Sequence, residues 1–137
     1  MEKIFKTKVT TTGGRDGKIK SEDGILDLEV RIPKEMGGVG GQFTNPEQLF
    51  AAGYSSCFDS ALNFVARSQK LKISSKVTAT VGLKKSGQTG FDLFVILDAA
   101  IEGVERETAS KLLELAHETC PYSRAIRNNI NVKVNLI

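Results

Sequence analysis

The most reactive side chains in this chain of 137 residues are its two cysteines, Cys57 and Cys120. They lie far apart in the sequence and do not form a CxxC redox pair. Together with the single histidine, His117, they are too few for a four-ligand zinc site, so we expect no metal and no cofactor. In a reducing cytosol, two cysteines that join usually form a transient, catalytic bond. The alternative is two unrelated buried thiols that act as small hydrophobic residues.

Cys57 lies in the segment Tyr54-Ser55-Ser56-Cys57-Phe58, which we expect to be part of a buried helix. Burial in apolar surroundings raises the pKa of a thiol and makes it unreactive unless a cation lies beside it. Arg15 is a candidate cation because it stands in a glycine-flanked turn, and a guanidinium can bind two anions at once. Glu47, near the helix start, is a candidate for the second anion. Each also has an ordinary reading, as a solvated loop arginine and as a glutamate that complements the helix dipole.

Cys120 comes at the end of a second expected helix and is followed by Pro121, which stops helices. Its sulfur is therefore expected on an apolar face near a helix end, where local movement is easy. This position suits a resolving thiol, which must approach a sulfenic acid to form a disulfide. For His117, three residues earlier, we expect a surface or packing role, because a thiolate paired with arginine needs no imidazole base.

Hydrophobic periodicity predicts the elements that position these residues. Alternation of apolar and polar residues predicts six strands. They cover approximately residues 3–12, 16–20, 25–32, 74–84, 91–101 and 131–136. A first helix is predicted from an Asn45 N-cap, with Pro46 at its first position, to about Gln69. Its composition is apolar enough for burial on nearly all sides.

A second helix is predicted over residues 105–119, with apolar side chains at helical spacing on one face. These are Ala109, Leu112, Leu113, Ala116 and Cys120. Residues 13–17 are expected to join two short strands as a hairpin, and residues 36–44, with four glycines, to lead into the first helix. The chain is thus predicted to be one α+β domain, residues 1–137. Because six strands cannot wrap a buried central helix alone, we expect a homodimer in which two such helices pack together.

Composition excludes several classes of function. The net charge of +3 is too small to indicate nucleic-acid binding. No apolar run approaches the ~20 residues that span a bilayer. The first residues, MEKIFKTKV, lack the apolar core of a signal peptide, so we expect a cytoplasmic protein.

Two long motifs closely resemble the organic hydroperoxide resistance (Ohr) branch of the Ohr/OsmC family. They are GQFTNPEQLFAAGYSSCF at residues 41–58 and AHETCPYS at residues 116–123, followed by Arg127 and Asn129-Ile130. Residues 13–17 (GGRDG) and Asp23-Gly24 match the hairpins near the start, so the resemblance covers essentially the whole chain. Asn128 departs from the pattern, since glycine is more usual there, and Ile101-Glu102 stand where a proline often follows the strand.

The resemblance implies an intertwined homodimer with thiol-dependent peroxidase activity on alkyl and fatty-acid hydroperoxides, in the response to oxidative stress. It implies that Cys57 attacks the peroxide and becomes a sulfenic acid, that Cys120 resolves it as a disulfide, and that Arg15 and Glu47 activate Cys57. Dihydrolipoamide or a lipoylated protein is the implied reductant. From proximity to Cys57 in the sequence, we expect an apolar substrate pocket lined by Phe43, Phe50, Tyr54 and Phe58.

Two alternatives remain open. An OsmC-type peroxidase has the same two-cysteine chemistry but a differently placed arginine, and Gly13-Gly14-Arg15 argues against it. A non-enzymatic peroxide sensor would use the disulfide to switch partner binding, although 137 residues leave no room for an added recognition module.

The position of Glu47 raises a geometric problem. Glu47 and Cys57 are ten residues apart, which places them ~15 Å apart along a straight helix. One chain cannot then supply both groups to one guanidinium. Either the helix breaks near Gly53, or the chain folds back at Pro46, or Arg15 and Glu47 reach Cys57 across a dimer interface. We favour the third.

Overall fold

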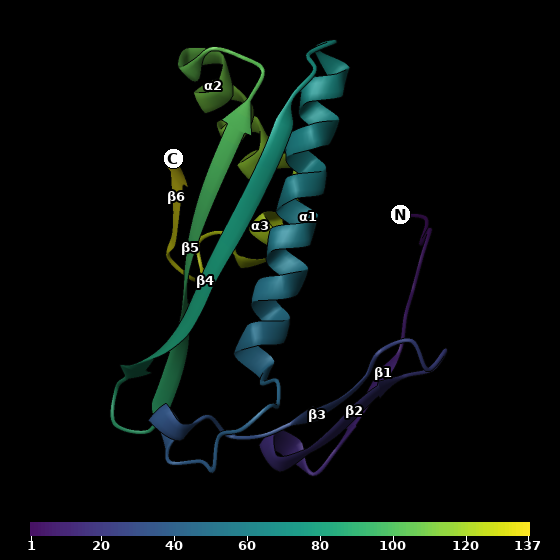
Figure 1. The fold of residues 1–137 in the computed structure, drawn as a ribbon, viewed down its shortest axis with the longest axis vertical. Coiled ribbons are helices and arrows are strands. Elements are labelled where there is room, and N and C mark those ends of the chain that lie inside the picture. Colours follow the sequence, from purple (N-terminus) through teal and green to yellow (C-terminus); the bar gives the residue numbers. More distant parts are fainter. The chain divides into compact units, whose positions relative to one another are not determined.

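The computed structural model describes residues 1–137 and divides them into two compact units, Met1–Leu49 and Phe50–Ile137 (Figure 1). Each unit has its own three-stranded sheet. The assignment of the whole chain to one domain stays a prediction, as does the homodimer. None of the helices combines the length and the apolar character that a membrane span requires.

The first unit is an antiparallel sheet of order β1-β2-β3 followed by a loop. The strands are β1 (Val9–Thr12), β2 (Gly17–Ser21) and β3 (Asp27–Val30), and short 3-10 turns cover Gly14–Asp16 and Lys34–Met36. The predicted hairpin at residues 13–17 is confirmed, because Thr12 pairs with Lys18 across it. Gly13 has φ +83° and Gly14 has φ +60°, a left-handed conformation that glycine adopts readily.

The second unit contains most of helix α1 (Pro46–Ser68) and a mixed sheet of order β4-β5-β6. Strands β4 (Ser74–Ser86) and β5 (Gly90–Glu102) form a long antiparallel hairpin, and β6 (Val132–Leu136) pairs with β5 in parallel. Two helices, α2 (Arg106–Thr119) and α3 (Pro121–Ile126), connect β5 to β6. This crossover is what a parallel pair of neighbouring strands requires.

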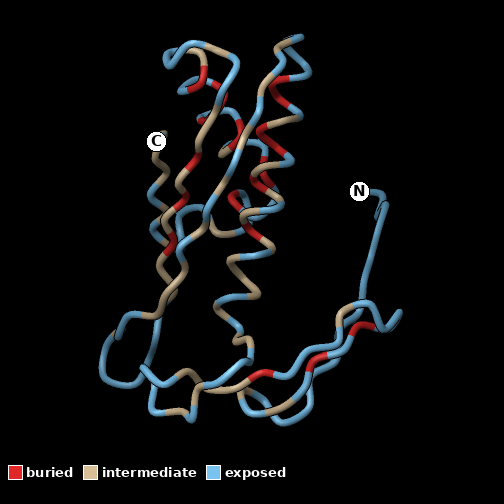
Figure 2. Tube along the Cα trace, viewed as in Figure 1, coloured by how far each residue is buried: buried red, intermediate tan, exposed pale blue.

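The core of the second unit lies between α1, α2 and one face of the sheet. On β5 the buried residues alternate, as Val95, Leu97 and Ala99, so a single face of the sheet is covered (Figure 2). The predicted apolar face of α2 is confirmed, since Ala109, Leu112, Leu113 and Ala116 are all buried, together with Cys120. This core fixes the helix that carries Cys57 against the segment that carries Cys120.

Helix α1 begins where the sequence predicts, because the side chain of Asn45 accepts a hydrogen bond of 2.8 Å from the backbone N–H of Gln48. Only one of its faces is buried in this chain. Tyr54, Phe58 and Leu62 are buried, whereas Ala52, Ser56 and Ser60 are exposed and Phe64 is 56% exposed. The expectation of burial on nearly all sides is therefore wrong for the single chain.

The predicted α+β class, six strands and two main helices are confirmed, with two differences. The first strand is confined to Val9–Thr12, because only those residues pair with β2. The short helix α3 was not predicted, since Pro121 was read only as a helix stop. Asn128 has φ +64°, which explains why a glycine suits that position and why asparagine, which tolerates the left-handed region, can replace it.

Candidate active site

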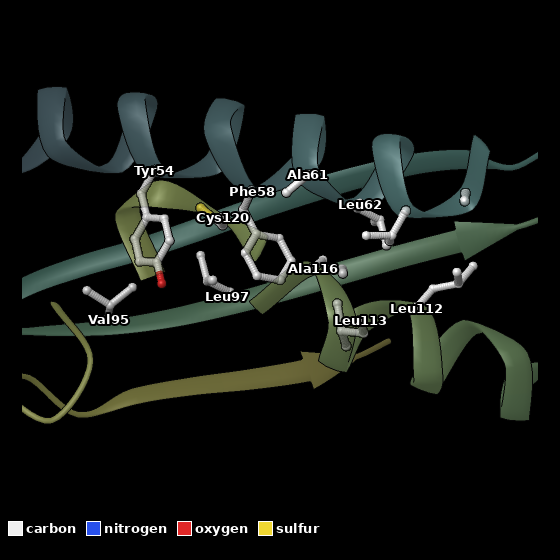
Figure 3. Close-up of a cluster of buried hydrophobic side chains, with 13 residues drawn as sticks. Tyr54, Phe58, Ala61, Leu62, Val95, Leu97, Leu112, Leu113, Ala116 and Cys120 are labelled. Carbon is white, nitrogen blue, oxygen red and sulfur yellow. The ribbon is translucent and has the colours of Figure 1, made fainter. Parts of the chain in front are cut away.

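The two cysteines lie side by side in the second unit. Both are free thiols, and the Sγ of Cys120 lies 3.6 Å from the Sγ of Cys57. Cys57 is partly exposed, whereas Cys120 is completely buried. Figure 3 shows the Cys120 sulfur beneath α1, between the side chains of Tyr54 and Phe58. The structure thus joins two residues that the sequence separates widely, and it makes only one of them accessible.

Local backbone structure places each sulfur. Cys57 lies midway along α1, and Cys120 is the single residue between α2 and α3. Its backbone is extended, with φ −60° and ψ 123°, so the chain turns a corner there. The next residue, Pro121, begins α3 at the first helical position, where a proline lacks no needed donor. Pro121 therefore ends one helix and starts another, which corrects its reading as a stop alone.

Aromatic rings surround the thiols. Tyr54 stacks on Tyr122 with ring centroids 5.8 Å apart, and it meets Phe50 and Phe58 edge to face at 6.2 and 6.4 Å. Gly53 permits this packing, because a Cβ there would lie 2.7 Å from the hydroxyl oxygen of Tyr122. Tyr122 was not predicted as a site residue, although it follows Cys120 by only two positions.

The structure gathers three of the four aromatic residues that were expected to line a substrate pocket. Tyr54 and Phe58 are completely buried in the core, and Phe50 packs against its edge. Phe43 belongs to the first unit, where the guanidinium of Arg31 lies over its ring at 4.6 Å. In the same unit, a cavity of about 340 Å³ is lined by Phe43, Arg31 and the glycine-rich loop.

The surroundings of Cys57 in its own unit do not favour the thiolate. Burial raises the pKa of the Cys57 thiol above its ordinary value, and the adjacent Cys120 raises it further. The backbone N–H of Tyr122 acts in the opposite direction and lowers this pKa. Since the net direction is upward, Cys57 needs a cation to become a strong nucleophile at neutral pH.

The candidate cation is found in the first unit, already paired. Arg15 donates hydrogen bonds from both terminal nitrogens to the two carboxylate oxygens of Glu47, at 2.8 and 2.5 Å. This bidentate pair is geometrically specific. The Arg15 hydrogen bonds hold the pKa of the Glu47 carboxyl below its ordinary range despite partial burial, and Glu47 raises the pKa of Arg15. Arg15 and Glu47 thus form a fixed, ionised unit at the tip of the β1–β2 hairpin and the start of α1.

His117 belongs to a hydrogen-bonded chain that was not predicted. Its Nδ1 lies 2.8 Å from the hydroxyl oxygen of Ser123, which lies 2.6 Å from the hydroxyl oxygen of Tyr54. Burial, and then Arg127, lower the pKa of His117, so the neutral imidazole is favoured. The surface or packing role expected for His117 stays a prediction. Nowhere do three His, Cys, Asp or Glu side chains gather closely enough to hold a metal ion.

Comparisons with known proteins give consistent results. Residues 39–135 match the model of the family described as OsmC-like protein. The chain is 46% identical over 136 residues to the organic hydroperoxide resistance protein OhrB of Bacillus subtilis, covering 97% of this chain and 98% of that protein. A crystal structure of an organic hydroperoxide resistance protein from Elizabethkingia anophelis superposes with a TM-score of 0.95 at 50% identity, covering 99% and 98% of the two chains.

The crystal structure of OhrB itself superposes with a TM-score of 0.90 at 43% identity, over 98% of this chain and all of that one. Sequence and structure therefore agree along the whole length of the chain. This chain belongs to the OsmC-like protein family, on its organic hydroperoxide resistance branch.

Proposed function

We propose that this protein is a cysteine-based peroxidase that reduces organic hydroperoxides to alcohols. The observation that carries the proposal is the pair of thiols 3.6 Å apart, one partly exposed and one buried. An accessible thiol can meet a peroxide, and a buried neighbour can then resolve the oxidised product. The names of the relatives support organic hydroperoxides as the substrate class.

In the first step, the Cys57 thiolate attacks one oxygen of the peroxide. The new S–O bond forms as the O–O bond breaks, and the alkoxide leaves as an alcohol after it takes up a proton. Cys57 is oxidised by two electrons to a sulfenic acid, and the peroxide is reduced by the same two.

In the second step, the Cys120 thiol condenses with the Cys57 sulfenic acid. The S–S bond forms, and the hydroxyl of the sulfenic acid leaves as water with the thiol proton. An external dithiol, for which dihydrolipoamide or a lipoylated protein is our candidate, then reduces the disulfide by thiol–disulfide exchange. Because Cys120 is buried, the incoming thiol is expected to attack the Cys57 sulfur.

The positive charge for the first step comes, in our proposal, from Arg15. Its pairing with Glu47 uses two of the five N–H donors of a guanidinium, which leaves donors for the thiolate and for the departing alkoxide. Because α1 runs without a break from Pro46 to Ser68 and includes Glu47, neither a helix broken near Gly53 nor a chain folded back at Pro46 explains how Glu47 and Cys57 cooperate. We therefore retain the proposal that Arg15 and Glu47 of one subunit activate Cys57 of the other subunit in a homodimer.

Subunit mixing tests this arrangement. Inactive Cys57→Ser chains are mixed with Arg15→Ala chains, which keep only slow activity, and subunit exchange is verified by native mass spectrometry. If the pair acts on the partner subunit, each mixed dimer regains one intact site and activity rises. No rise in activity after verified exchange would contradict the arrangement.

The substrate preference would come from the aromatic residues near Cys57. Phe50 is half-buried at the edge of the core and Tyr54 and Phe58 form the buried layer behind it, so they favour an alkyl chain over water. Phe43, which belongs to the first unit, stays a predicted member of the substrate pocket.

The decisive experiment for the proposed function is steady-state reduction of cumene hydroperoxide. Dihydrolipoamide is compared with glutathione and thioredoxin as reductant, and hydrogen peroxide with cumene hydroperoxide as substrate, with Cys57→Ser protein as the control. We expect rapid multiple turnover with dihydrolipoamide and slower reduction of hydrogen peroxide. Oxidation once per chain without turnover would instead support a redox sensor.

A further inference from the structure

A hydrogen-bonded chain of three side chains links the two segments that carry the thiols. Tyr54, on α1, and Ser123, on α3, are both completely buried, and their oxygens are 2.6 Å apart. Ser123 is also 2.8 Å from Nδ1 of His117, on α2. A buried hydroxyl with two good partners is a strong local constraint, because breaking either contact leaves a polar group without water or protein to bind.

Each member of this chain lies one helical turn from a cysteine. Tyr54 precedes Cys57 by three residues on α1, His117 precedes Cys120 by three, and Ser123 follows Cys120 by three. Tyr54 and Cys57 are three residues apart on one helix and share a face, whereas His117 and Ser123 lie in the two helices that flank Cys120. The contacts therefore tie the backbone on both sides of Cys120 to the helix turn that precedes Cys57.

A further hydrogen bond joins the two helices on either side of Cys120. The side chain of Arg127 donates a hydrogen bond of 2.8 Å to the backbone carbonyl oxygen of His117, which joins the residue after α3 to the last turn of α2. Cys120 is the only residue between these two helices. Its sulfur therefore has little freedom except through rotation of its own side chain.

The resolving step of the proposed reaction is sensitive to this geometry. The two sulfur atoms are 3.6 Å apart, and they must approach to about 2.05 Å in the disulfide. A misplacement of about 1 Å at reacting atoms can slow a step by roughly 100-fold. The first step has no such requirement, because Cys57 reacts there with a substrate that diffuses in.

We propose that Tyr54, Ser123 and His117 are positioning residues for the resolving step, which preset the approach of Cys120 to oxidised Cys57. They act through the backbone on either side of Cys120, and their side-chain hydrogen bonds are to one another. This inference rests on the proposed peroxidase function and deepens it.

The test separates the two steps in a single turnover. Reduced protein is mixed rapidly with one equivalent of cumene hydroperoxide. Aliquots are quenched either in acid, to measure the disulfide by intact mass, or with dimedone, to trap the sulfenic acid. Ser123→Ala and Tyr54→Phe each remove one hydroxyl. We expect sulfenic acid to form at the wild-type rate in Ser123→Ala, and the disulfide to form about tenfold more slowly in both variants, within the loss that small misplacement produces.

Two further variants distinguish positioning from general weakening. His117→Asn keeps a hydrogen-bonding group where Nδ1 lies and should retain fast disulfide formation, whereas His117→Leu should lose it. Asn135→Ala removes a side-chain hydrogen bond to Asp98 in the same unit, far along the chain from either cysteine, and should leave both steps unchanged. The Ser123→Ala, Tyr54→Phe double variant should be no slower than the slower single variant, because both break the same chain.

The outcomes are distinct. If wild-type protein forms neither sulfenic acid nor disulfide, the proposed function fails. If it does, and Ser123→Ala, Tyr54→Phe and His117→Leu all form the disulfide at the wild-type rate, the positioning role is overturned. Should Ser123→Ala fail to fold, Tyr54→Phe and the two His117 variants decide the question. Equal slowing by Asn135→Ala would also overturn it.

Discussion

The two compact units carry different parts of the proposed chemistry and are built differently. In Met1–Leu49 only Ile19, Ser21 and Val30 are buried, and the charged pair Arg15–Glu47 lies on a hairpin tip and a helix start. In Phe50–Ile137 the two thiols lie against a continuous core. Charges act over several ångströms and tolerate small displacements, whereas sulfur atoms must meet at bonding distance. The better-packed unit thus holds the groups that need the stricter geometry.

The sharpest way to test this division is to remove the attacking thiol. Cys57→Ser should abolish peroxidase activity, because a serine hydroxyl is not ionised near neutral pH. Cys120→Ser should instead spare the first oxidation and leave Cys57 as a sulfenic acid that excess peroxide oxidises further. Intact-mass spectrometry after one equivalent of peroxide distinguishes the two. An unmodified Cys120→Ser protein would show that the two roles are assigned wrongly.

Removal of the charge from the other unit should have a smaller effect. Arg15→Ala should raise the pKa of Cys57 and slow its oxidation by about 100-fold, the usual order for a lost electrostatic group. Arg15→Lys keeps the charge without the bidentate geometry, so its oxidation rate should fall between those of the wild type and Arg15→Ala. Thiolate absorbance against pH, measured beside the oxidation rate, checks both. A titration of Arg15→Ala that matches wild type would exclude Arg15 as the activating cation.

A core substitution tests whether packing belongs mainly to the second unit. Leu97 is completely buried on β5, so Leu97→Ala should lower the free energy of unfolding by about 3 kcal/mol. Leu28 on β3 is 40% exposed in the chain, and Leu28→Ala should cost well under about 1 kcal/mol. Urea unfolding of both variants gives the comparison. Equal losses would mean that the first unit is packed more tightly than its exposure indicates.

The smallest expected effect is a dependence of stability on pH through Glu47. Its pKa is lowered in the folded protein, chiefly by the Arg15 hydrogen bonds, so the carboxylate contributes stability above its ordinary pKa of about 4.3. That contribution is lost as the pH falls through the folded value. Glu47→Gln should therefore lower the melting temperature at pH 7 more than at pH 3. The difference should be worth less than about 1 kcal/mol, because the pair is partly exposed.

The Arg15→Ala background provides the control for this measurement. In that background Glu47 has lost its main partner, so the difference between the two pH values should become smaller. A difference as large as with Arg15 present would show that Arg15 does not cause it.

Local patterns were sufficient to predict much of the fold. Alternation placed the β4–β5 hairpin within one or two residues, because each strand presents one face to the core. The Asn45 cap was predictable from residue type alone, since its hydrogen bond is to a neighbour three positions on. Arg15 and Glu47 were proposed as a pair from chemistry and resemblance, and the structure joins them in a bidentate contact.

What the sequence did not predict depends on contacts between distant residues or on an ambiguous local pattern. Pro121 is compatible both with the end of one helix and with the start of another, and in the structure it begins α3, whose Ser123 is hydrogen-bonded to Tyr54. The parallel pairing of β6 with β5 is likewise a tertiary feature. The proximity of Cys57 to Cys120 followed from resemblance to a family, since nothing in their spacing indicates it.

The complete burial of Cys120 makes the two thiols unequal towards any bulky reagent. A maleimide should label native, reduced protein once per chain, at Cys57, and reach the second thiol only on unfolding. The same shielding should protect Cys120 from direct attack by peroxide in the cell. Irreversible over-oxidation, which inactivates the protein, would then occur at Cys57 alone.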